Sequence, residues 1–543
     1  MQKTNFKKDV DNLFRLLLVL PLLFLTDLTF AQTSSFESNL PLLIIETGGK
    51  TIFDEPKITA HLKIVNNGKH ATNRFTDEPT DYDGFIGIEI RGASSSKYPQ
   101  TPYLFETRDS LGENNNVSLL GMPEENDWVL LSNYNDKSFL RNLLAFHLFE
   151  QMGNYAPRMK LCEVFIDNDY KGIYLFGEKL KRDKNRIDIS RLNPEENEGE
   201  DLTGGYIFKV DYIDGDEFWV SKYSPVDHPD FKIRFIHYYP KSEDITTSQK
   251  NYIKSFVDDF EDALYTKSFT DKKGYRSFIN DASFIDYFIL NEVARNNDGF
   301  KKSRYFHKDK NGLIKAGPVW DFDWAWKNIS QCPVVSATNG SGWAHHINDC
   351  NPWVKSPGWM IKMLQDTSFA NQVDCRYADL RTTILSDEYI FHFVDSVTSL
   401  LDIAQKRHFQ KYKILGKNVG APEVDAQPTT YKGEVDKLKN WISLRLRWLD
   451  GHMVGQCGRS TPEETDEVLV IYPNPSSGIV NLNSKKDIKR IEIYNLTGNL
   501  VSKSNLYSRE VVILNLSHLQ QGVYLIHVHF TDGNTASSKL VLH

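Results

Sequence analysis

The stretch that organises this chain is RYFHKDKNGLIKAGPVWDFD, residues 304–323. Its two apolar runs are separated by Lys, Asp, Asn and Gly, so it predicts a β-hairpin. A helical pattern over 286–295 leads into this hairpin. One carboxylate, Asp298, stands in the loop between the helix and the hairpin, and two more, Asp321 and Asp323, stand where the return strand ends.

These three carboxylates are candidates for a metal and phosphate site. The two ends of a hairpin lie side by side, so we expect Asp298 close to Asp321. Clustered carboxylates repel one another unless a cation neutralises them, and Mg²⁺ favours one or two carboxylates together with phosphate oxygens. Protein kinases use the same order of parts, namely a catalytic loop, a hairpin and an Asp that holds Mg²⁺ on the nucleotide. The alternative is that each Asp only caps a turn.

Phosphoryl transfer also requires cations for the phosphates, and the candidates lie earlier in the chain. A loop of small residues leaves a predicted strand, and its backbone N–H groups are able to approach a phosphate. Two basic residues are four positions apart on a predicted helix, and a charged pair ends another strand. The alternatives are a surface turn, a solvated stripe and a strand end that faces water. The candidates are Arg91 and Ser94 in the loop, Lys137 and Arg141 on the helix, and Glu178 and Lys179 at the strand end.

The main body divides into a sheet-rich part and a helix-rich part. Strand patterns cover 42–46, 57–65, 84–91, 103–107, 128–131, 161–166 and 172–178. Helical periodicity covers 136–152, 248–265, 283–294, 384–407 and 431–449. We therefore predict an α+β fold with two lobes, and ligands often bind in the cleft between two such lobes.

The N-terminus predicts export. Basic residues precede the apolar run 16–25, and Thr29 and Ala31 fit a cleavage site. We therefore predict a signal peptide over 1–31, with an uncleaved membrane anchor as the alternative. Only this stretch is apolar enough to span a bilayer, so we expect no integral membrane segment after cleavage.

Composition narrows the classes of partner. The chain has 543 residues, with 64 Lys and Arg against 72 Asp and Glu, for a formal net charge of −8. That length allows two to four domains, and 40% hydrophobic residues exclude disorder as the main state. A mildly acidic balance lacks the broad basic footprint that nucleic acid requires, so we expect no nucleic-acid partner.

Export makes the five cysteines candidates for disulfides. Cys332 with Cys350, and Cys375 with Cys457, are the simplest pairings, although the sequence alone does not determine connectivity. Cys162 lies in an apolar stretch and is expected to be a buried thiol. Zinc is disfavoured, because the chain has no Cys-x-x-Cys or His-x-x-x-His cluster.

The tail predicts a separate module. Residues 458–467 are polar and acidic without periodicity, which indicates a linker. Beyond them, short β-rich runs bounded by turn signals predict a small antiparallel β-sandwich over 468–543.

This tail resembles the type A sorting domain. The resemblance is carried by IYPNPSSG (471–478), IYNLTG (493–498), LQQGVY (519–524) and KLVL (539–542). In Bacteroidetes such domains direct cargo through the type IX secretion system. The resemblance therefore implies handling by that machinery and a secreted or outer-membrane surface location.

The main body resembles the spore coat protein H (CotH) kinase family. The matching motifs are IEIRGASS (88–95), NDWVLL (126–131), DKSFLRN (136–142), YAPR (155–158), GIYLFGEK (172–179), WDFD (320–323) and RLRWLD (445–450). The resemblance covers nearly all of 40–453, and we assign the domain to 32–457. It implies an atypical protein kinase with a diverged bilobal kinase-like fold, which uses ATP and Mg²⁺ (or Mn²⁺) to phosphorylate Ser or Thr on surface proteins.

The resemblance also implies roles for individual residues. Asp298 takes the catalytic-loop position and Asp321 the metal position, and Asp323 and Asp298 complete the candidate metal ligands. The nucleotide contacts would be Arg91, Ser94, Lys137, Arg141, Glu178 and Lys179. The chain departs from the family at Gln100-Thr101, where two lysines are common. It also has Ser303 five places after Asp298, where ordinary kinases have Asn, so a second metal ligand must come from elsewhere.

Three hypotheses follow for function. The leading one is an exported kinase that transfers the γ-phosphoryl group of ATP to Ser or Thr of surface or extracellular proteins. The runner-up is a non-catalytic kinase-like surface or adhesion protein, which the missing lysines and the scarcity of extracellular ATP favour. A secreted sugar hydrolase ranks below both, because no carboxylate pair has a glycosidase's flanking aromatic residues.

Overall fold

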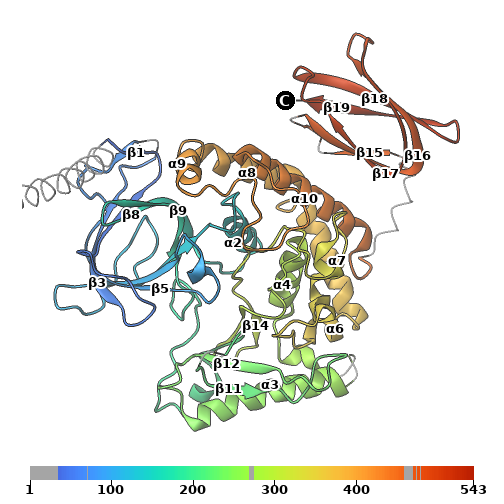
Figure 1. The fold of residues 1–543 in the computed structure, drawn as a ribbon. Helices are drawn as coiled ribbons and strands as arrows, with labels where there is room; N and C mark the ends of the chain where they lie inside the picture. Colours follow the sequence, from blue (N-terminus) through green and yellow to red (C-terminus); the bar gives the residue numbers. More distant parts are fainter. Residues whose placement is uncertain are drawn as a thin grey trace, which may run out of the picture.

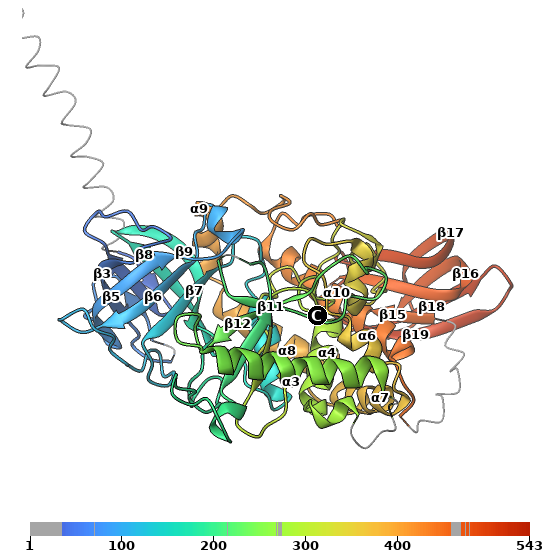
Figure 2. The same ribbon diagram turned by 90° about the horizontal axis from the view of Figure 1, so that it is seen from below.

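The structure, a computed structural model, describes residues 35–542 except 70, 214, 268, 270–273, 458–468, 473 and 477. The predicted signal peptide and linker lie outside the described residues. The fold is a mixed α+β arrangement, as expected, with a β-barrel at one end, helices in the middle and a separate β-rich region at the C-terminal end (Figures 1 and 2). Within the described residues, no helix combines the length and the apolar character that crossing a bilayer requires.

Seven strands of the N-terminal region close into the barrel. Their order is β2-β3-β5-β6-β7-β9-β8, and β2 closes the ring by pairing in parallel with β8. The strands are β2 (Leu42–Glu46), β3 (Ile58–Val65), β5 (Tyr82–Ile90), β6 (Tyr103–Arg108), β7 (Asp127–Ser132), β8 (Met159–Ile166) and β9 (Asp169–Glu178). Alternate residues of each strand point inward, so Phe105, Trp128 and Phe176 pack together in the barrel's own core.

A two-residue turn joins β8 to β9. Ile166 pairs with Asp169, and the intervening Asp167 and Asn168 both have positive φ angles, of 47° and 65°. Asp and Asn tolerate this left-handed conformation, which suits a tight hairpin. The strands predicted over 161–166 and 172–178 therefore form a hairpin, in which β9 begins three residues earlier than expected. A small separate sheet pairs β1 (Glu37–Ser38) with β4 (Asn73–Arg74).

A second sheet contains the predicted hairpin. Its order is β11-β12-β10-β13-β14. The strands are β10 (Tyr206–Val210), β11 (Phe218–Val220), β12 (Arg234–Tyr239), β13 (Arg304–Lys308) and β14 (Lys315–Ala316). The hairpin is formed by β13 and β14, with Phe306 opposite Ala316. The other edge of β13 pairs with β10, where Val210 faces Arg304, so three chain segments meet at one end of this sheet.

Helices surround this sheet and pack against the outer wall of the barrel (Figure 1). They are α2 (Arg141–Gln151), α3 (Thr247–Thr266), α4 (Asp281–Val293), α5 (Pro333–Ser336), α6 (Trp359–Met363), α7 (Thr367–Arg381), α8 (Asp387–Leu400), α9 (Ala404–Lys411) and α10 (Tyr431–His452). Short 3₁₀ turns are η1 (Ser95–Lys97), η2 (Asp201–Thr203), η3 (Tyr275–Ser277) and η4 (Ala344–Cys350).

The helix predicted over 384–407 is wrong in its continuity. The first helix, α8, ends at Leu400, and after a turn over 401–403 the chain continues as α9, which packs on β9. There His408 Nδ1 accepts a hydrogen bond from the backbone N–H of Ile173 at 3.1 Å. Contact with the barrel therefore overrides the helical periodicity of the segment.

The helix predicted from 136 begins only at Arg141. Upstream, the Asp136 carboxylate accepts hydrogen bonds from the backbone N–H groups of Ser138 and Arg141, at 3.1 and 2.8 Å. These bonds hold 136–140 in a turn rather than in a helix. Lys137 and Arg141 therefore do not share a helix face, which corrects the expected pairing of the two cations.

The C-terminal region is one antiparallel sheet over its own core. Its strands are β15 (Leu469–Tyr472), β16 (Ile479–Asn495), β17 (Leu500–Asn515), β18 (Gly522–Phe530) and β19 (Thr535–Leu542). Runs 478–482 and 488–496, which the sequence separates, are one strand, β16, with register irregularities between Ser484 and Arg490. Such irregularities bend a strand without ending it, so β16 continues through the bend. β16 pairs with three strands, namely with β15 through residues 481–484, with β18 through residues 488–495 and with β17 along both parts.

Both predicted disulfides are present. Cys332 bonds to Cys350 and Cys375 bonds to Cys457, with Cα atoms 5.5 and 4.8 Å apart. The second bond ties the end of the main body to α7. Cys162 is a free, buried thiol, as expected.

A buried ionic network joins α4 to α10 and to η4. Arg445 donates to Glu292 Oε2 at 2.9 Å and to the carbonyl oxygens of Gly340 and Gly342 at 2.7 Å. The Glu292 carboxylate also accepts the backbone N–H of His345 at 2.8 Å. Arg445 and Glu292 are fully buried and form an ion pair, and Glu292 Oε1 also lies 2.7 Å from Nδ1 of His345. The network orients α4, which leads directly to Asp298.

We expect Arg445→Ala to lower the free energy of unfolding by about 3–5 kcal/mol, because it leaves the Glu292 carboxylate buried without its cation. Urea denaturation followed by circular dichroism measures this change. The control is Lys406→Ala, which removes an exposed i,i+4 pair with Asp402 and is expected to cost less than about 1 kcal/mol. Equal losses for the two variants would contradict the importance of the network.

Candidate functional site

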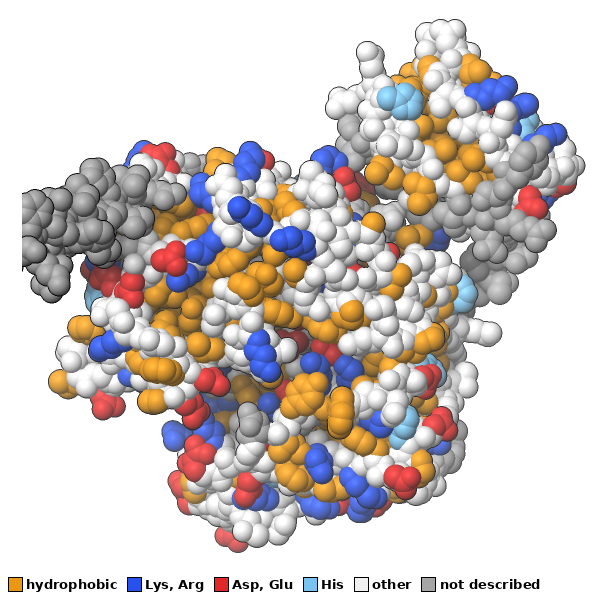
Figure 3. All heavy atoms as spheres, in the orientation of Figure 1, with side chains coloured by type: hydrophobic (Ala, Val, Ile, Leu, Met, Phe, Trp, Pro, Cys, Tyr) orange, Lys and Arg blue, Asp and Glu red, His pale blue; other side chains and the backbone are white. Residues whose placement is uncertain are grey.

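A cavity of about 700 Å³ opens where the barrel meets the second sheet. Its walls come from the loop after β5, the chain after β10, the segments on either side of the β13–β14 hairpin and the loop after η4. Figure 3 shows this face of the molecule hollowed between the barrel and the β11–β12 region, with charged side chains inside the hollow. An adjoining cavity of about 290 Å³ shares Arg91, Gly92, Tyr305 and Trp320 with it.

The structure brings most of the predicted site residues to these two cavities. Asp298, Asp321, Asp323, Arg91 and Ser94 line the larger one. Lys179 lines the smaller one, together with Arg91. The remaining three candidates, Lys137, Arg141 and Glu178, line neither cavity.

Asp298 lies in the segment between α4 and β13 and is almost completely buried. Its carboxylate pairs with Lys301 and, at 3.2 Å, with Lys302. Burial by itself raises the pKa of Asp298, but the two lysines outweigh burial and lower it. The carboxylate is therefore ionised at neutral pH and is already partly neutralised.

Asp321 follows the hairpin and adopts a left-handed backbone conformation, with φ of 57°. Its carboxylate accepts a hydrogen bond from Ser303 Oγ at 2.7 Å, which ties the two ends of the hairpin together. The next residue, Phe322, donates its backbone N–H to Asn142 Oδ1 of α2 at 2.8 Å. Asp323 accepts a hydrogen bond from Asn135 Nδ2 at 2.6 Å. Bonds from two directions thus hold a strained turn in place.

The positive charge near the Asp321 and Asp323 carboxylates is too small to compensate their negative charges. Burial raises the pKa of both Asp321 and Asp323, and the charge of Asp323 raises the pKa of Asp321 further. Lys302 and Arg91 lower the pKa of Asp321 without reversing this direction. Two half-buried acids whose charges repel form an arrangement that a bound cation relieves.

The donors present fit Mg²⁺ better than a metal held by protein ligands alone. Within the described residues, no three His, Cys, Asp or Glu side chains form a metal-binding group. Of the three carboxylates of the expected joint site, Asp298 is engaged by Lys301 and Lys302, which leaves Asp321 and Asp323 as the better candidates for metal ligands. Asn297 lines the same cavity, and its Oδ1 is buried without a hydrogen-bond donor. Mg²⁺ prefers such oxygen donors and completes its shell with phosphate and water.

Lys137 and Arg141 have structural roles. Both are 2% exposed. Lys137 pairs with Glu434 of α10 at 2.5 Å, and Arg141 pairs with Asp136 and donates to the carbonyl oxygen of Ala325 at 2.9 Å. Their charges are therefore used inside the protein, and neither reaches a ligand in the cavity.

Glu178 and Gln100 are also structural. The Glu178 carboxylate accepts hydrogen bonds from the Arg158 side chain and from the Tyr155 hydroxyl. Gln100, which stands where the family commonly has lysine, is fully buried. It donates to the carbonyl oxygen of Ile173 at 2.8 Å and accepts the backbone N–H of Asn133 at 3.0 Å. It therefore fastens two barrel segments rather than facing a ligand.

Several cavity residues were missed by sequence reasoning. They are Lys209, Asp211, Tyr212, Lys301, Lys302, Tyr305, Trp324 and Trp353. The spacing of Lys301 and Lys302, three and four places after Asp298, was a usable signal for an ion pair. By contrast, Lys209 and Asp211 reach the site only because β10 pairs with β13, and no local pattern announces that pairing.

Two family models match the chain. The model for CotH kinase protein matches residues 88–449, which is two thirds of the chain, and the model for the secretion system C-terminal sorting domain matches residues 470–543. No curated protein matches the chain. The sorting domain indicates export by type IX secretion to the outer-membrane surface. The chain therefore belongs to the CotH kinase protein family and carries a type IX sorting domain at its C-terminus.

Proposed function

We propose that this protein is a secreted, Mg²⁺-dependent (or Mn²⁺-dependent) atypical protein kinase, which transfers the γ-phosphoryl group of ATP to Ser or Thr of surface or extracellular proteins. One observation carries the proposal: Asp298 and the Asp321-Phe322-Asp323 turn, from opposite ends of one hairpin, line the same cavity as Arg91. The barrel and the helical region then serve as the two lobes of a kinase-like fold, with the nucleotide between them.

The phosphate end of the nucleotide belongs in the larger cavity. Arg91 lies over the Trp320 ring at 5.4 Å, and its Nη1 is buried without a hydrogen-bond acceptor. A phosphate oxygen supplies that acceptor. Ser94 belongs to the exposed loop after β5, whose backbone N–H groups add further donors. Mg²⁺ held by Asp321 and Asp323 would offset the negative charge of the phosphates.

The smaller cavity is the proposed site of the base. Leu104, Val129 and Leu180 give it an apolar wall, and Lys179 stands at its edge. Lys179 also pairs with Asp127 at 3.4 Å, which fixes the direction of its side chain. A planar base with a polar edge fits such a mixed lining.

Asp298 is the proposed base that orients the acceptor hydroxyl. Its carboxylate accepts the hydroxyl proton as the acceptor oxygen bonds to the γ-phosphorus, while the bond from that phosphorus to the bridging oxygen breaks and ADP leaves. Lys302, which lies between Asp298 and Asp321, is placed to balance charge on the transferred group. Both acids raise the pKa of Lys302 despite its burial, so it stays protonated.

The alternative is a non-catalytic kinase-like surface protein. Two observations favour it. The Asp298 carboxylate is already paired with Lys301 and Lys302, and Gln100 is a structural residue where the family commonly supplies a cation. Measurements of transfer and of nucleotide binding separate the two functions.

We expect Asp321→Asn to reduce transfer of label from γ-labelled ATP to an acceptor protein by about a hundredfold or more, because it removes a metal-binding carboxylate. The matched control is Asp349→Asn, which changes an exposed carboxylate on the nearby η4 turn that does not line either cavity. Equal labelling by the wild-type protein and Asp321→Asn would remove the proposed mechanism.

We expect Arg91→Ala to weaken ATP binding by about tenfold or more in the presence of Mg²⁺, because a charge-assisted hydrogen bond to phosphate is lost. Isothermal titration calorimetry measures the affinity. Lys97→Ala is the control, since Lys97 is an exposed cation near the same loop and does not line the cavities. No binding heat for the wild-type protein would favour the non-catalytic alternative.

A further inference from the structure

Trp353 is exposed in an unusual place. It is 93% exposed, the largest fraction among the large hydrophobic side chains of the described residues. It also lines the 700 Å³ cavity, together with Pro352 and Val354 of the same loop. Single exposed apolar side chains are common on protein surfaces, so exposure alone carries no conclusion. Two further features of Trp353 indicate a binding role, namely its position at the cavity and the rigidity of its loop.

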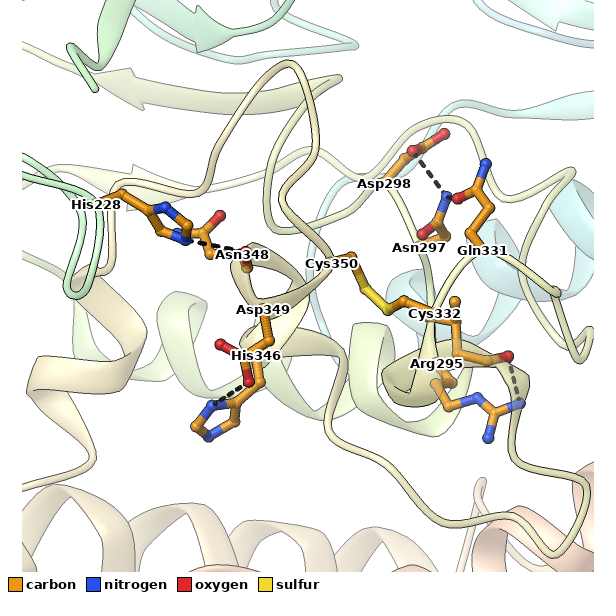
Figure 4. The surroundings of a disulfide bond; sticks show 11 residues. His228, Arg295, Asn297, Asp298, Gln331, Cys332, His346, Asn348, Asp349 and Cys350 are labelled. Carbon is orange, nitrogen blue, oxygen red and sulfur yellow. Dashed lines mark hydrogen bonds and ion pairs between the residues drawn. A yellow bond between two sulfur atoms is a disulfide. The ribbon is translucent and has the colours of Figure 1, made fainter. Parts of the chain in front are cut away.

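The loop that presents Trp353 is held from several sides. The Cys332–Cys350 disulfide fixes its start beside Gln331, whose side chain faces Asn297 in Figure 4. Lys355 donates to Asn351 Oδ1 at 2.6 Å and to the carbonyl oxygen of Pro352 at 3.0 Å.

Further bonds close the base of this loop. Asn348 and Ser356 exchange two hydrogen bonds, of 2.8 and 3.0 Å, across it. His228 Nε2 lies 3.0 Å from the carbonyl oxygen of Asn348, and Figure 4 draws this bond from the opposite side of the loop. The indole is therefore held out toward solvent by a pre-organised loop, which lowers the entropy lost when it binds a partner.

A second aromatic ring belongs to the same cavity. Tyr212, just after β10, is 50% exposed and also lines the cavity. Lys302 lies over its ring at 5.1 Å, which links Tyr212 directly to the lysine that pairs with Asp298. Two exposed rings from separate segments thus border the cavity that holds the proposed catalytic carboxylate.

The charges around these rings are already compensated inside the protein. Lys301 and Lys302 pair with Asp298, and Lys209 pairs with Asp211 at 3.4 Å. An acidic peptide would have to compete with these carboxylates. The occupant that complements this lining is neutral and apolar, because its side chain loses little hydration and gains contact with two rings.

A sugar is less well matched than an apolar side chain. Sugar hydroxyls need polar partners beside the aromatic faces. Among the polar groups of the lining, Asn297 Nδ2 donates to Gln331 Oε1 at 3.3 Å and Asp211 pairs with Lys209, and Asn297 Oδ1, which has no donor, is buried.

We propose that Trp353 and Tyr212 form a docking surface for the acceptor protein, which they bind through an aromatic or aliphatic side chain next to the acceptor Ser or Thr. The inference rests on the proposed kinase function for the role of the hydroxyl. The contact itself requires only the two rings and the neutral lining. Exposed aromatic residues on rigid loops are the type of residue that dominates binding energy at protein interfaces.

The test measures binding of short fluorescent peptides to the full chain by anisotropy. The peptides carry one Ser, flanked by Phe, by Gly or by Glu. We expect the Phe-flanked peptide to bind best, and Trp353→Ala to weaken its binding by about tenfold or more. Trp353→Phe is expected to retain most of the affinity. Leu111→Ala is the matched control, since Leu111 is 85% exposed and lines neither cavity.

Kinetics and calorimetry separate this inference from the kinase proposal. Trp353→Ala is expected to raise KM for the Phe-flanked peptide while kcat and the affinity for ATP stay unchanged, because Trp353 supplies none of the metal or phosphate contacts proposed above. If the wild-type protein binds the peptide but transfers no phosphoryl group, the proposed kinase function is wrong and the docking surface is supported. If the wild-type protein and Trp353→Ala transfer the phosphoryl group to the Phe-flanked peptide equally well, the docking surface is wrong and the kinase function is supported.

Two other outcomes also overturn the docking surface. One is a preference for the Glu-flanked peptide. The other is displacement of the bound peptide by a soluble oligosaccharide whose own binding depends on Trp353, which would assign the rings to a glycan.

Discussion

The candidate site depends on the antiparallel pairing of β13 on both of its edges. Val210 faces Arg304 on one side, and Phe306 faces Ala316 on the other. Backbone hydrogen bonds in this arrangement leave little freedom in where the chain enters and leaves the sheet. The segments with Asp211, Asp298 and Asp321 must therefore emerge at the same end, and the Ser303–Asp321 hydrogen bond joins two of them.

The electrostatics of that end are uneven. Asp298 is paired with two lysines, whereas Asp321 and Asp323 repel each other in a half-buried turn. The turn is kept in place by Asn135 and Asn142, which reach it from the chain around the start of α2. Proteins accept local repulsion and backbone strain of this kind mainly where a ligand relieves them. In the same region, Lys137 and Arg141 form buried ion pairs with Glu434 and Asp136.

Stability and export come from other parts of the molecule. The barrel, the helical region and the C-terminal sheet have separate clusters of buried apolar side chains. The Arg445–Glu292 network aligns α4 with α10 and so sets the direction in which the chain enters the Asp298 segment. The Cys375–Cys457 disulfide fastens the main body just before the sorting domain, which suits a protein that functions in an oxidising environment.

The sequence by itself determined the local elements, because strand alternation, helical periodicity and turn residues act over a few neighbours. It predicted the β13–β14 hairpin and both disulfide pairs, and its motifs identified the family and the sorting domain. Its errors concern longer contacts. The helix predicted over 384–407 divides into two because α9 packs on the barrel. Lys137 forms an ion pair with Glu434, which is almost three hundred residues away in the sequence. Only the tertiary structure added Lys209, Tyr212 and Trp353 to the cavity. The pairing of β10 with β13 brings Lys209 and Tyr212 there, and the placement of the loop after η4 brings Trp353, and neither leaves a periodic trace in the sequence.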